Sequence, residues 1–241
     1  LDGKKILVDP VLSNYASPFP GMIKAFEGTD LYTTDDIPDI DYLVITHDHW
    51  DHLDMKTIRK LHTRVKQVIT GLGVGAHLEY WGVEAAKITE FDWNDSLVTA
   101  DGFEFHATPA RHFSGRGFKR NGTLWVSFVV KSPSKKLFIG GDGGYDTHFE
   151  KIGQKFGPFD QVILEAGQYD RRWKFIHMMP EEVVQAAKDL NAKSLLPVHH
   201  SKFALAAHPW DEPMQLVKAE HLSTQAGYRL ISPVIGKAIP D

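Results

Sequence analysis

The sequence contains no cysteine. This absence excludes disulfide bonds, thiolate metal ligands and a cysteine nucleophile, so any bound metal must be held by nitrogen and oxygen atoms. Long apolar runs are also missing, because the longest one, residues 124–130, is far shorter than the roughly 20 residues of a membrane-spanning helix. A formal charge of −4 provides no basic excess, so we expect no nucleic-acid partner.

The beginning of the chain also lacks two common features. Leu1 is not a methionine, and the first residues lack the pattern of a signal peptide. We therefore expect a soluble, cytoplasmic protein whose natural sequence continues upstream of Leu1.

The length and composition are those of an ordinary folded protein. The chain has 241 residues, of which 42% are hydrophobic and 24% are charged. We expect one domain spanning residues 1–241, because this length buries a large core and no linker-like segment interrupts it.

Short β-branched runs alternate with helical stretches, which predicts a mixed α/β fold. Expected strands cover residues 6–8, 42–46, 67–70, 86–90, 103–108, 123–131, 136–139, 161–164 and 194–197. Expected helices cover residues 55–62, 74–81, 147–155, 180–191 and 213–226. Residues 16–38 are expected to form a long loop that covers a site.

The chain has 13 histidines, and three of them lie in the run His47-Asp48-His49-Trp50-Asp51-His52 after an apolar strand. Side chains alternate along an extended chain, so His47 and His49 point to one side and can bind one metal. Asp51 and His52 can turn toward a neighbouring position if the chain then enters a helix. This pattern is typical of a two-metal hydrolase.

The spacing H-x-H-x-D-H after an apolar strand resembles the signature of the metallo-β-lactamase superfamily. The resemblance continues in order along the chain through Pro109-Ala110-Arg111-His112, Gly140-Gly141-Asp142-Gly143-Gly144-Tyr145 and Pro197-Val198-His199-His200. It is strongest for the branch of the N-acylphosphatidylethanolamine-hydrolysing phospholipase D and the ascorbate-6-phosphate lactonases. The motifs shared with this branch are Val8-Asp9-Pro10, His49-Trp50-Asp51-His52-Leu53-Asp54, His177-Met178-Met179-Pro180-Glu181-Glu182 and the stretch of residues 203–213.

The resemblance implies a four-layer αββα sandwich with the metals at one edge. The superfamily usually has an N-terminal hairpin before the segment that starts here at Asp2, and this hairpin is missing from the sequence.

The resemblance also implies a ligand set for two divalent ions. One ion would be bound by His47, His49 and His112, the other by Asp51, His52 and His199, with Asp142 bridging both. Zn²⁺ suits these ligands, with Mn²⁺ and Fe²⁺ as alternatives. Judged on the residues alone, His112 also suits an exposed loop, and Asp142 also suits a glycine-rich turn.

Four further residues have roles that the sequence leaves open. The family pattern favours His199 over the adjacent His200 as a ligand, whereas His200, Lys202 and His208 have no assigned role. His177 precedes a helix whose first turn is acidic, where it is either a loop residue or a proton donor.

Three functions are compatible with this pattern. The first is hydrolysis of a phosphodiester by a metal-activated water, as in a phospholipase D-like enzyme. Asp51 would orient the water and His177 would protonate the leaving group. The second is hydrolysis of a lactone or ester of a small polar metabolite, and the third is a non-catalytic, metal-stabilised binding module.

The expected substrate is a small molecule or a lipid headgroup, and the sequence does not determine the oligomeric state. A lipid would favour the apolar residues Phe19, Met22, Ile23 and Phe26 as an entry surface. A small anion would favour the basic residues Arg111, Arg116, Lys119 and Arg120.

Overall fold

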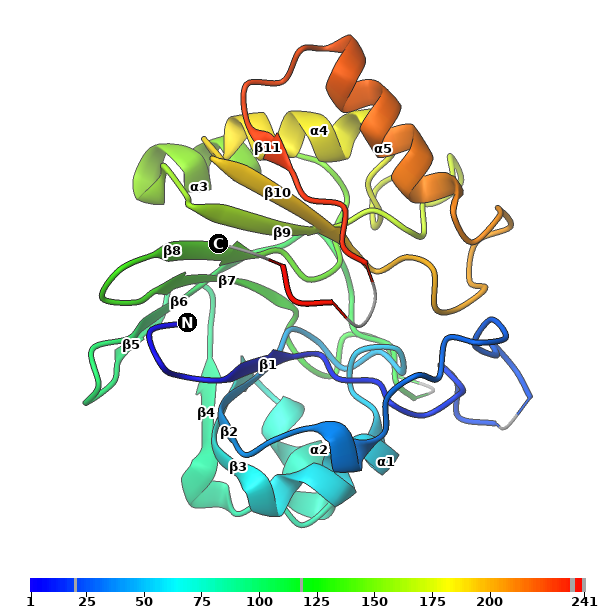
Figure 1. Ribbon diagram of the computed structural model, residues 1–241. Helices are drawn as coiled ribbons and strands as arrows, with labels where there is room; N and C mark the ends of the chain where they lie inside the picture. The colour runs from blue at the N-terminus through cyan, green and yellow to red at the C-terminus, as the bar shows by residue number, and fades with distance from the viewer. Residues whose placement is uncertain (20, 118, 235–236, 240–241) are drawn as a thin grey trace. The chain divides into compact units, whose positions relative to one another are not determined.

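The computed structural model describes residues 1–19, 21–117, 119–234 and 237–239. The chain forms two compact units. The first unit contains residues 1–109 and 113–134, and the second contains residues 110–112 and 135–241. Figure 1 shows the helices and strands of both units along the chain.

The first unit contains a parallel sheet with the strand order β1-β2-β3-β4. Its strands are β1 (Ile6–Val8), β2 (Ile40–Ile45), β3 (Val65–Gly71) and β4 (Ile88–Phe91). Because the strands are parallel, their carboxyl ends lie at the same edge of the sheet, and the segments that follow them meet there. The segments after β1 and β2 are therefore neighbours.

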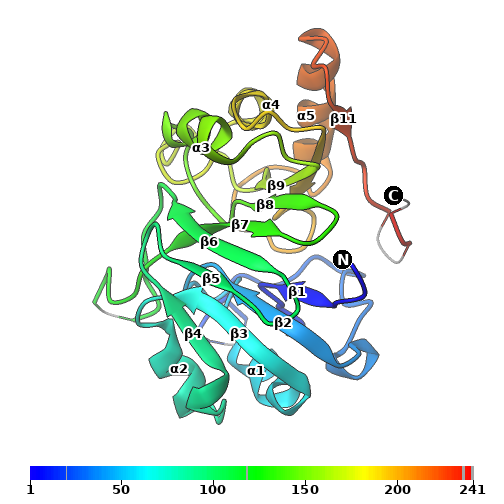
Figure 2. The ribbon, with the colours of Figure 1, turned by 90° about the vertical axis from the view of Figure 1, so that its left-hand side faces the viewer.

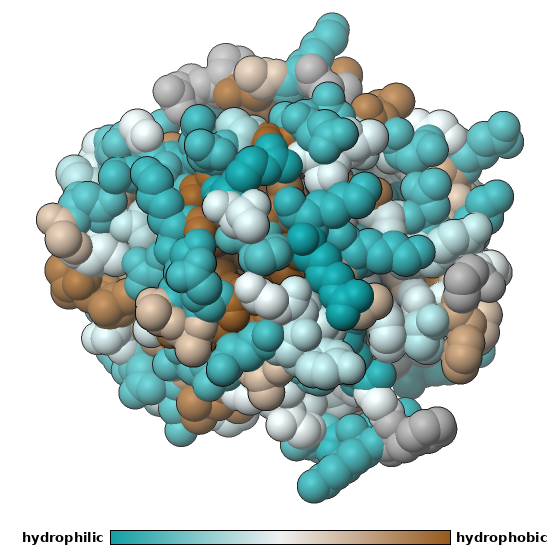
Figure 3. Space-filling view, turned by 90° about the horizontal axis from the view of Figure 1, so that it is seen from below, coloured by the Kyte–Doolittle hydropathy of each residue, from teal (hydrophilic) through white to brown (hydrophobic). Residues whose placement is uncertain are grey.

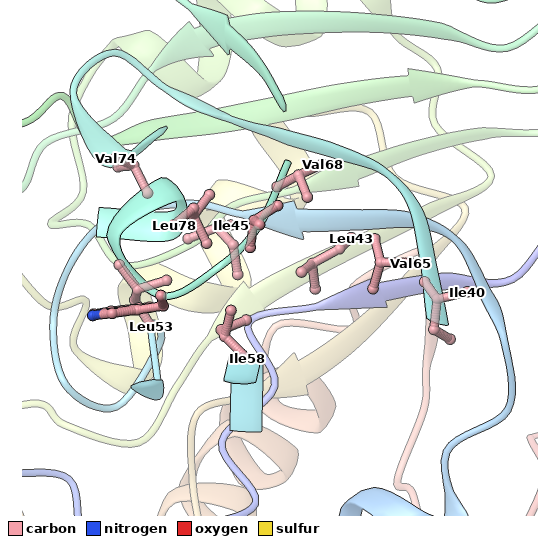
Figure 4. Packing of buried hydrophobic residues seen from close by; sticks show 11 residues of the cluster. Ile40, Leu43, Ile45, Leu53, Ile58, Val65, Val68, Val74 and Leu78 are labelled. Carbon is pink, nitrogen blue, oxygen red and sulfur yellow. The ribbon is translucent and has the colours of Figure 1, made fainter. Parts of the chain in front are cut away.

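Helices α1 (Met55–Leu61) and α2 (Val74–Tyr80) lie on one face of this sheet (Figure 2). Asp54 caps α1 by accepting a hydrogen bond from the amide of Lys56 at 3.1 Å. The side chains of Ile45, Ile58 and Leu78 gather between the sheet and the helices, in the hydrophobic core of this unit (Figure 4). The core fixes the position at which the chain leaves β2.

Three antiparallel strands complete the first unit: β5 (Ser96–Val98), β6 (Glu104–Pro109) and β7 (Val126–Lys131). The aromatic ring of Tyr42 in β2 packs against the rings of Phe103 and Phe105, with centroids 5.6 and 5.0 Å away. Short 3-10 helices lie at Thr34–Asp36, His62–Arg64 and Ala85–Lys87.

The second unit contains the parallel strands β8 (Lys136–Ile139), β9 (Gln161–Glu165), β10 (Ser194–Val198) and β11 (Arg229–Leu230), in the order β8-β9-β10-β11. Its helices are α3 (His148–Phe156), α4 (Pro180–Asp189) and α5 (Glu212–Ser223). Helix α4 packs on β9 and contacts both α3 and α5. The carboxyl ends of β8, β9 and β10 share one edge.

The five expected helices and the mixed α/β class are confirmed. Two short strands, β5 and β11, were not expected. Most boundaries of the expected elements differ from the observed ones by one to three residues, among them the starts of β4 and β7. Residues 86–87 belong to a 3-10 helix, and β7 begins at Val126, since the amide of Leu124 instead donates to the carbonyl of Leu72.

The expected long loop at residues 16–38 is largely confirmed, whereas its covering of a site stays a prediction. In its described part, residues 16–38 contain the 3-10 helix Thr34–Asp36 and an end of the isolated bridge between Tyr15 and Lys24.

Figure 3, seen from the side on which α1 and α2 lie, shows mainly hydrophilic side chains with separate hydrophobic groups. In the part of the chain that the structure describes, no helix is long and apolar enough to cross a bilayer.

Candidate functional site

The first unit brings four of the predicted ligands together in residues 46–54, which we call the ligand loop. The ring centroids of His47 and His49 are 4.5 Å apart, and those of His47 and His52 are 4.1 Å apart. A carboxylate oxygen of Asp51 lies 3.9 Å from Nε2 of His52. His47 and His52 are buried, so three imidazoles and a carboxylate are concentrated in a largely buried turn.

Asp9 fixes the orientation of two of these rings, and this role was not predicted. It directly follows β1, so the parallel pairing of β1 and β2 places it beside the ligand loop. Its Oδ2 lies 2.8 Å from Nδ1 of His52 and accepts a hydrogen bond from the Thr46 hydroxyl at 2.7 Å. That hydroxyl is also 3.0 Å from Nδ1 of His47. With Nδ1 held by the protein, Nε2 is the atom of each ring that suits a metal.

The second unit gathers three histidines around the carboxylate of Asp142, which follows β8 and is 4% exposed. Oδ2 of Asp142 lies 3.5 Å from Nε2 of His199, 3.9 Å from Nε2 of His112 and 4.0 Å from Nδ1 of His177. His199 follows β10, two strands from β8 in the same sheet. The shared edge of β8 and β10 therefore brings Asp142 and His199 together, as their positions after predicted strands indicated.

Glu165, the last residue of β9, is a further member of this group that sequence reasoning missed. Its side chain is 1% exposed, and Oε1 accepts a hydrogen bond from the amide of Met178 at 2.7 Å. The same oxygen is 3.5 Å from Nδ1 of His177, and Oε2 is 4.0 Å from Nδ1 of His199. A carboxylate at the end of an otherwise apolar strand was the signal that could have identified it.

His112 is anchored from the side opposite Asp142. Its Nδ1 lies 3.0 Å from the carbonyl oxygen of Ile176, which leaves Nε2 as the atom nearer Asp142. Because the ring is buried, the interpretation of His112 as an exposed loop residue is wrong.

The adjacent histidines 199 and 200 have different surroundings. His199 has a backbone φ of +63°, a left-handed conformation that is unusual for a residue other than glycine. Its ring approaches Asp142, whereas Nδ1 of His200 lies 2.7 Å from the hydroxyl of Ser201. Burial lowers the pKa of His200. The geometry thus follows the family pattern in directing His199, and not His200, toward the carboxylate.

The other residues left open by the sequence contact aromatic rings in the second unit. His208 stacks on Tyr169, with ring centroids 4.5 Å apart and an interplanar angle of 10°. The ammonium group of Lys202 lies 5.5 Å from the ring centroid of Phe203.

Two of the basic residues considered for binding an anion are engaged with other side chains. Arg111 pairs with Asp146 at 3.1 Å and lies over the ring of Phe175 at 4.4 Å. Arg116 lies over the ring of Trp50 at 3.9 Å.

The donor atoms gathered in the second unit have a spacing that fits a metal. Two atoms that bind one ion tetrahedrally are about 3.4 Å apart, given metal–ligand distances of about 2.1 Å. The separations of 3.5 to 4.0 Å around Asp142 exceed hydrogen-bond lengths and approach this spacing. One ligand atom each from Glu165, His177 and His199 also lie within 4.8 Å of one another. Imidazole and carboxylate groups are the ligands expected for Zn²⁺, Mn²⁺ or Fe²⁺.

Comparisons with known proteins agree with the fold and the motifs. A protein of Mycobacterium tuberculosis named as uncharacterized is 41% identical over 223 residues, which cover 91% of this chain and 60% of the relative. The N-acyl-phosphatidylethanolamine-hydrolyzing phospholipase D 1 of Caenorhabditis elegans is 30% identical, covering 91% of this chain and 66% of the relative. The chain thus spans about three fifths of the length of the first of these relatives.

A solved structure of similar fold is the isothiocyanate hydrolase from Delia radicum gut bacteria, with a TM-score of 0.75 and 19% identity. The alignment covers 100% of this chain and 94% of the hydrolase. The expected metallo-β-lactamase type of fold is confirmed, as is the resemblance to the phospholipase D-like branch. Residues 4–200 match the family model described as the β-lactamase superfamily domain, so the chain belongs to this superfamily.

Proposed function

We propose that this chain is a metal-dependent hydrolase that cleaves phosphodiesters. The observation that carries the proposal is the group of three imidazoles within 4.0 Å of one carboxylate oxygen of Asp142. Three imidazoles whose side chains are only 0 to 13% exposed, around one buried acid, would be costly unless a cation or a proton is shared among them. Membership of the superfamily adds independent support.

The proposed ligands are those expected from the family pattern: His47, His49 and His112 for one ion, Asp51, His52 and His199 for the other, and Asp142 for both. The geometry within each unit supports this assignment, because Nδ1 of His52 and of His112 is bound by protein oxygens. When bound, two divalent ions activate a water at neutral pH and stabilise negative charge at a phosphoryl or acyl centre.

Side chains of the protein would then orient the attacking water and supply a proton to the leaving group. Asp51 orients the attacking water from the ligand loop, and His177 donates a proton to the leaving oxygen. Glu165 lies 3.5 Å from Nδ1 of His177, where its carboxylate can orient the imidazole. Asp9 keeps the His52 ring in place through Nδ1.

Two observations favour a phosphodiester of a lipid over a small anion. The C. elegans relative is named as a phospholipase D. In addition, Phe19 and Met22 in the early loop are 66% and 57% exposed, whereas Arg111 and Arg116 are held by other side chains. Hydrolysis of a lactone or ester of a small metabolite is the alternative, and a non-catalytic metal-binding module is the alternative of another class. The cytoplasmic location stays a prediction.

The test compares chelated protein with protein reloaded with Zn²⁺, Mn²⁺ or Fe²⁺. Three substrates separate the functions: bis(p-nitrophenyl) phosphate, vesicles containing N-acylphosphatidylethanolamine, and a γ-lactone. We expect metal-dependent cleavage of the two phosphodiesters. Cleavage of the lactone alone would favour the alternative reaction, and a metal-loaded protein inactive on all three would favour the binding module.

A variant distinguishes the proposed role of His177 as a proton donor from a general effect of substitution on folding. Replacing His177 with Gln should lower turnover by about 10²- to 10⁴-fold, the usual contribution of a general acid. The matched control is His106→Gln, because His106 pairs with Glu104 at 3.0 Å in β6. Equal losses in the two variants would contradict the assigned role of His177.

A further inference from the structure

A short segment of the first unit, residues 113–116, covers the ligand loop. The ring of Phe113 meets the ring of His49 edge to face, with centroids 4.6 Å apart. The amide of Gly115 donates a hydrogen bond to Oδ1 of Asp48 at 3.0 Å. A Cβ atom on Gly115 would lie 3.3 Å from Nε2 of His49, so the covering segment approaches the loop closely.

Arg116 ends this segment and binds the backbone of the ligand loop at two points. Its Nη1 donates to the carbonyl oxygen of Asp48 at 3.1 Å and to that of Leu53 at 2.6 Å. The proposed ligands His49, Asp51 and His52 all lie in the chain between these two carbonyls. One guanidinium nitrogen therefore fixes the span of the turn that presents them.

Two tryptophans enclose the same guanidinium. Its central carbon lies 3.9 Å from the ring centroid of Trp50 in the ligand loop and 4.7 Å from that of Trp81 after α2. Burial lowers the pKa of Arg116 to about 10, so the group remains charged at neutral pH. The cation thereby connects the ligand loop to the buried Trp81 at the end of α2.

We propose that Arg116 is a positioning residue that holds the ligand loop in the conformation needed to bind metal. This inference rests on the proposed function, but it concerns a residue outside the ligand set. The position of Arg116 does not suit a direct contact with substrate, because rings and carbonyls surround it. Lysine is not an equivalent replacement, since it lacks the planar group that stacks between two rings while donating to carbonyls.

The experiment uses Arg116→Met, with Arg116→Lys as a milder second variant in case the first folds poorly. The matched control is Arg64→Met, because Arg64 also donates to two backbone carbonyls of the first unit, those of Thr34 and Ile37. Two quantities are measured: amide hydrogen exchange of residues 46–54 in chelated protein, and the affinity for Zn²⁺ by competition with a chromogenic chelator.

We expect faster exchange of residues 46–54 in Arg116→Met, together with a loss of Zn²⁺ affinity of about 10- to 100-fold, the usual cost of removing an outer-shell partner. For Arg116→Lys, both the exchange rate and the Zn²⁺ affinity should lie between those of Arg116→Met and the parent. Arg64→Met should keep the parent's exchange in residues 46–54 and its Zn²⁺ affinity within about twofold, because its contacts are elsewhere.

Unchanged exchange of residues 46–54 in Arg116→Met overturns the inference, and so does faster exchange with normal Zn²⁺ affinity. An equal loss of affinity in Arg64→Met also overturns it, since the effect would then reflect general destabilisation. A parent protein that binds no Zn²⁺ contradicts the proposed function itself, whereas normal binding in Arg116→Met contradicts only the role of Arg116.

Discussion

Oδ2 of Asp9 lies 2.8 Å from Nδ1 of His52, although 43 positions separate these residues in the chain. The contact exists because β1 and β2 pair in parallel and release both residues at the same edge of the sheet. A carboxylate in this position orients an imidazole and raises its strength as a metal ligand.

Asp9→Asn should therefore weaken metal binding by about 10- to 100-fold, because the neutral amide is a poorer partner for the imidazole. Zinc competition would measure the loss. The matched control is Asp41→Asn, since Asp41 pairs with Lys66 and accepts from the amide of Lys5 in the same unit. Equal affinity in Asp9→Asn and the parent would show that Asp9 is not required to orient His52.

Gly167 has no room for a side chain beside His199. A Cβ atom there would lie 1.8 Å from the carbonyl oxygen of His199, so Gly167→Ala must displace the backbone that carries this proposed ligand. We expect a loss of metal affinity of at least about tenfold. Gly227→Ala is the control, because a Cβ atom at Gly227 meets nothing within 4 Å. Parent-like affinity in both variants would argue against His199 as a ligand.

The pair His199 and His200 can be separated directly. His199→Ala should remove metal from one of two sites, because its ring approaches Asp142. His200→Ala should leave the metal content intact, because its Nδ1 is near the Ser201 hydroxyl. Elemental analysis of the two purified variants measures their metal content. The reverse result would identify His200, and not His199, as the ligand.

Acid should destabilise the protein partly through His148. Burial lowers the pKa of His148 to about 4 from its ordinary value of 6.5. Between these values the unfolded chain binds a proton that the folded chain does not, so stability falls as the pH drops from about 6.5 toward 4.

Urea unfolding of chelated protein measures this effect. Between pH 6.5 and 4.5, the free energy of unfolding should fall by about 2 kcal/mol more in the parent than in His148→Gln. Parallel losses in the two proteins would contradict this assignment of the pKa.

The fold and most of the proposed site were predictable because their signals are local. Each expected ligand lies shortly after an apolar strand. Within each unit the parallel strands bring the residues that follow them to one edge, whereas His112 follows the antiparallel strand β6. The spacing of His47, His49, Asp51 and His52 needs no knowledge of distant residues. The five helices were recognisable for the same reason.

The supporting residues were not predictable, because their roles depend on partners far away in the chain. Asp9 gains its role from the pairing of β1 with β2. Glu165 gains its role because the later residue Met178 donates a backbone hydrogen bond to it. Arg116 resembled a surface cation that attracts anions. Its position between Trp50 and Trp81 and its bonds to two backbone carbonyls show that it contacts the ligand loop instead.

Asp142 is the proposed ligand of two metal ions, and elemental analysis of the parent beside Asp142→Asn tests this role most directly. After reconstitution with Zn²⁺, the parent should contain close to two ions per chain. Asp142→Asn should lose binding at both positions together with phosphodiesterase activity, because a neutral amide offsets the repulsion between two cations poorly. A parent that binds no metal, or a folded Asp142→Asn variant with two ions and full activity, would contradict the account.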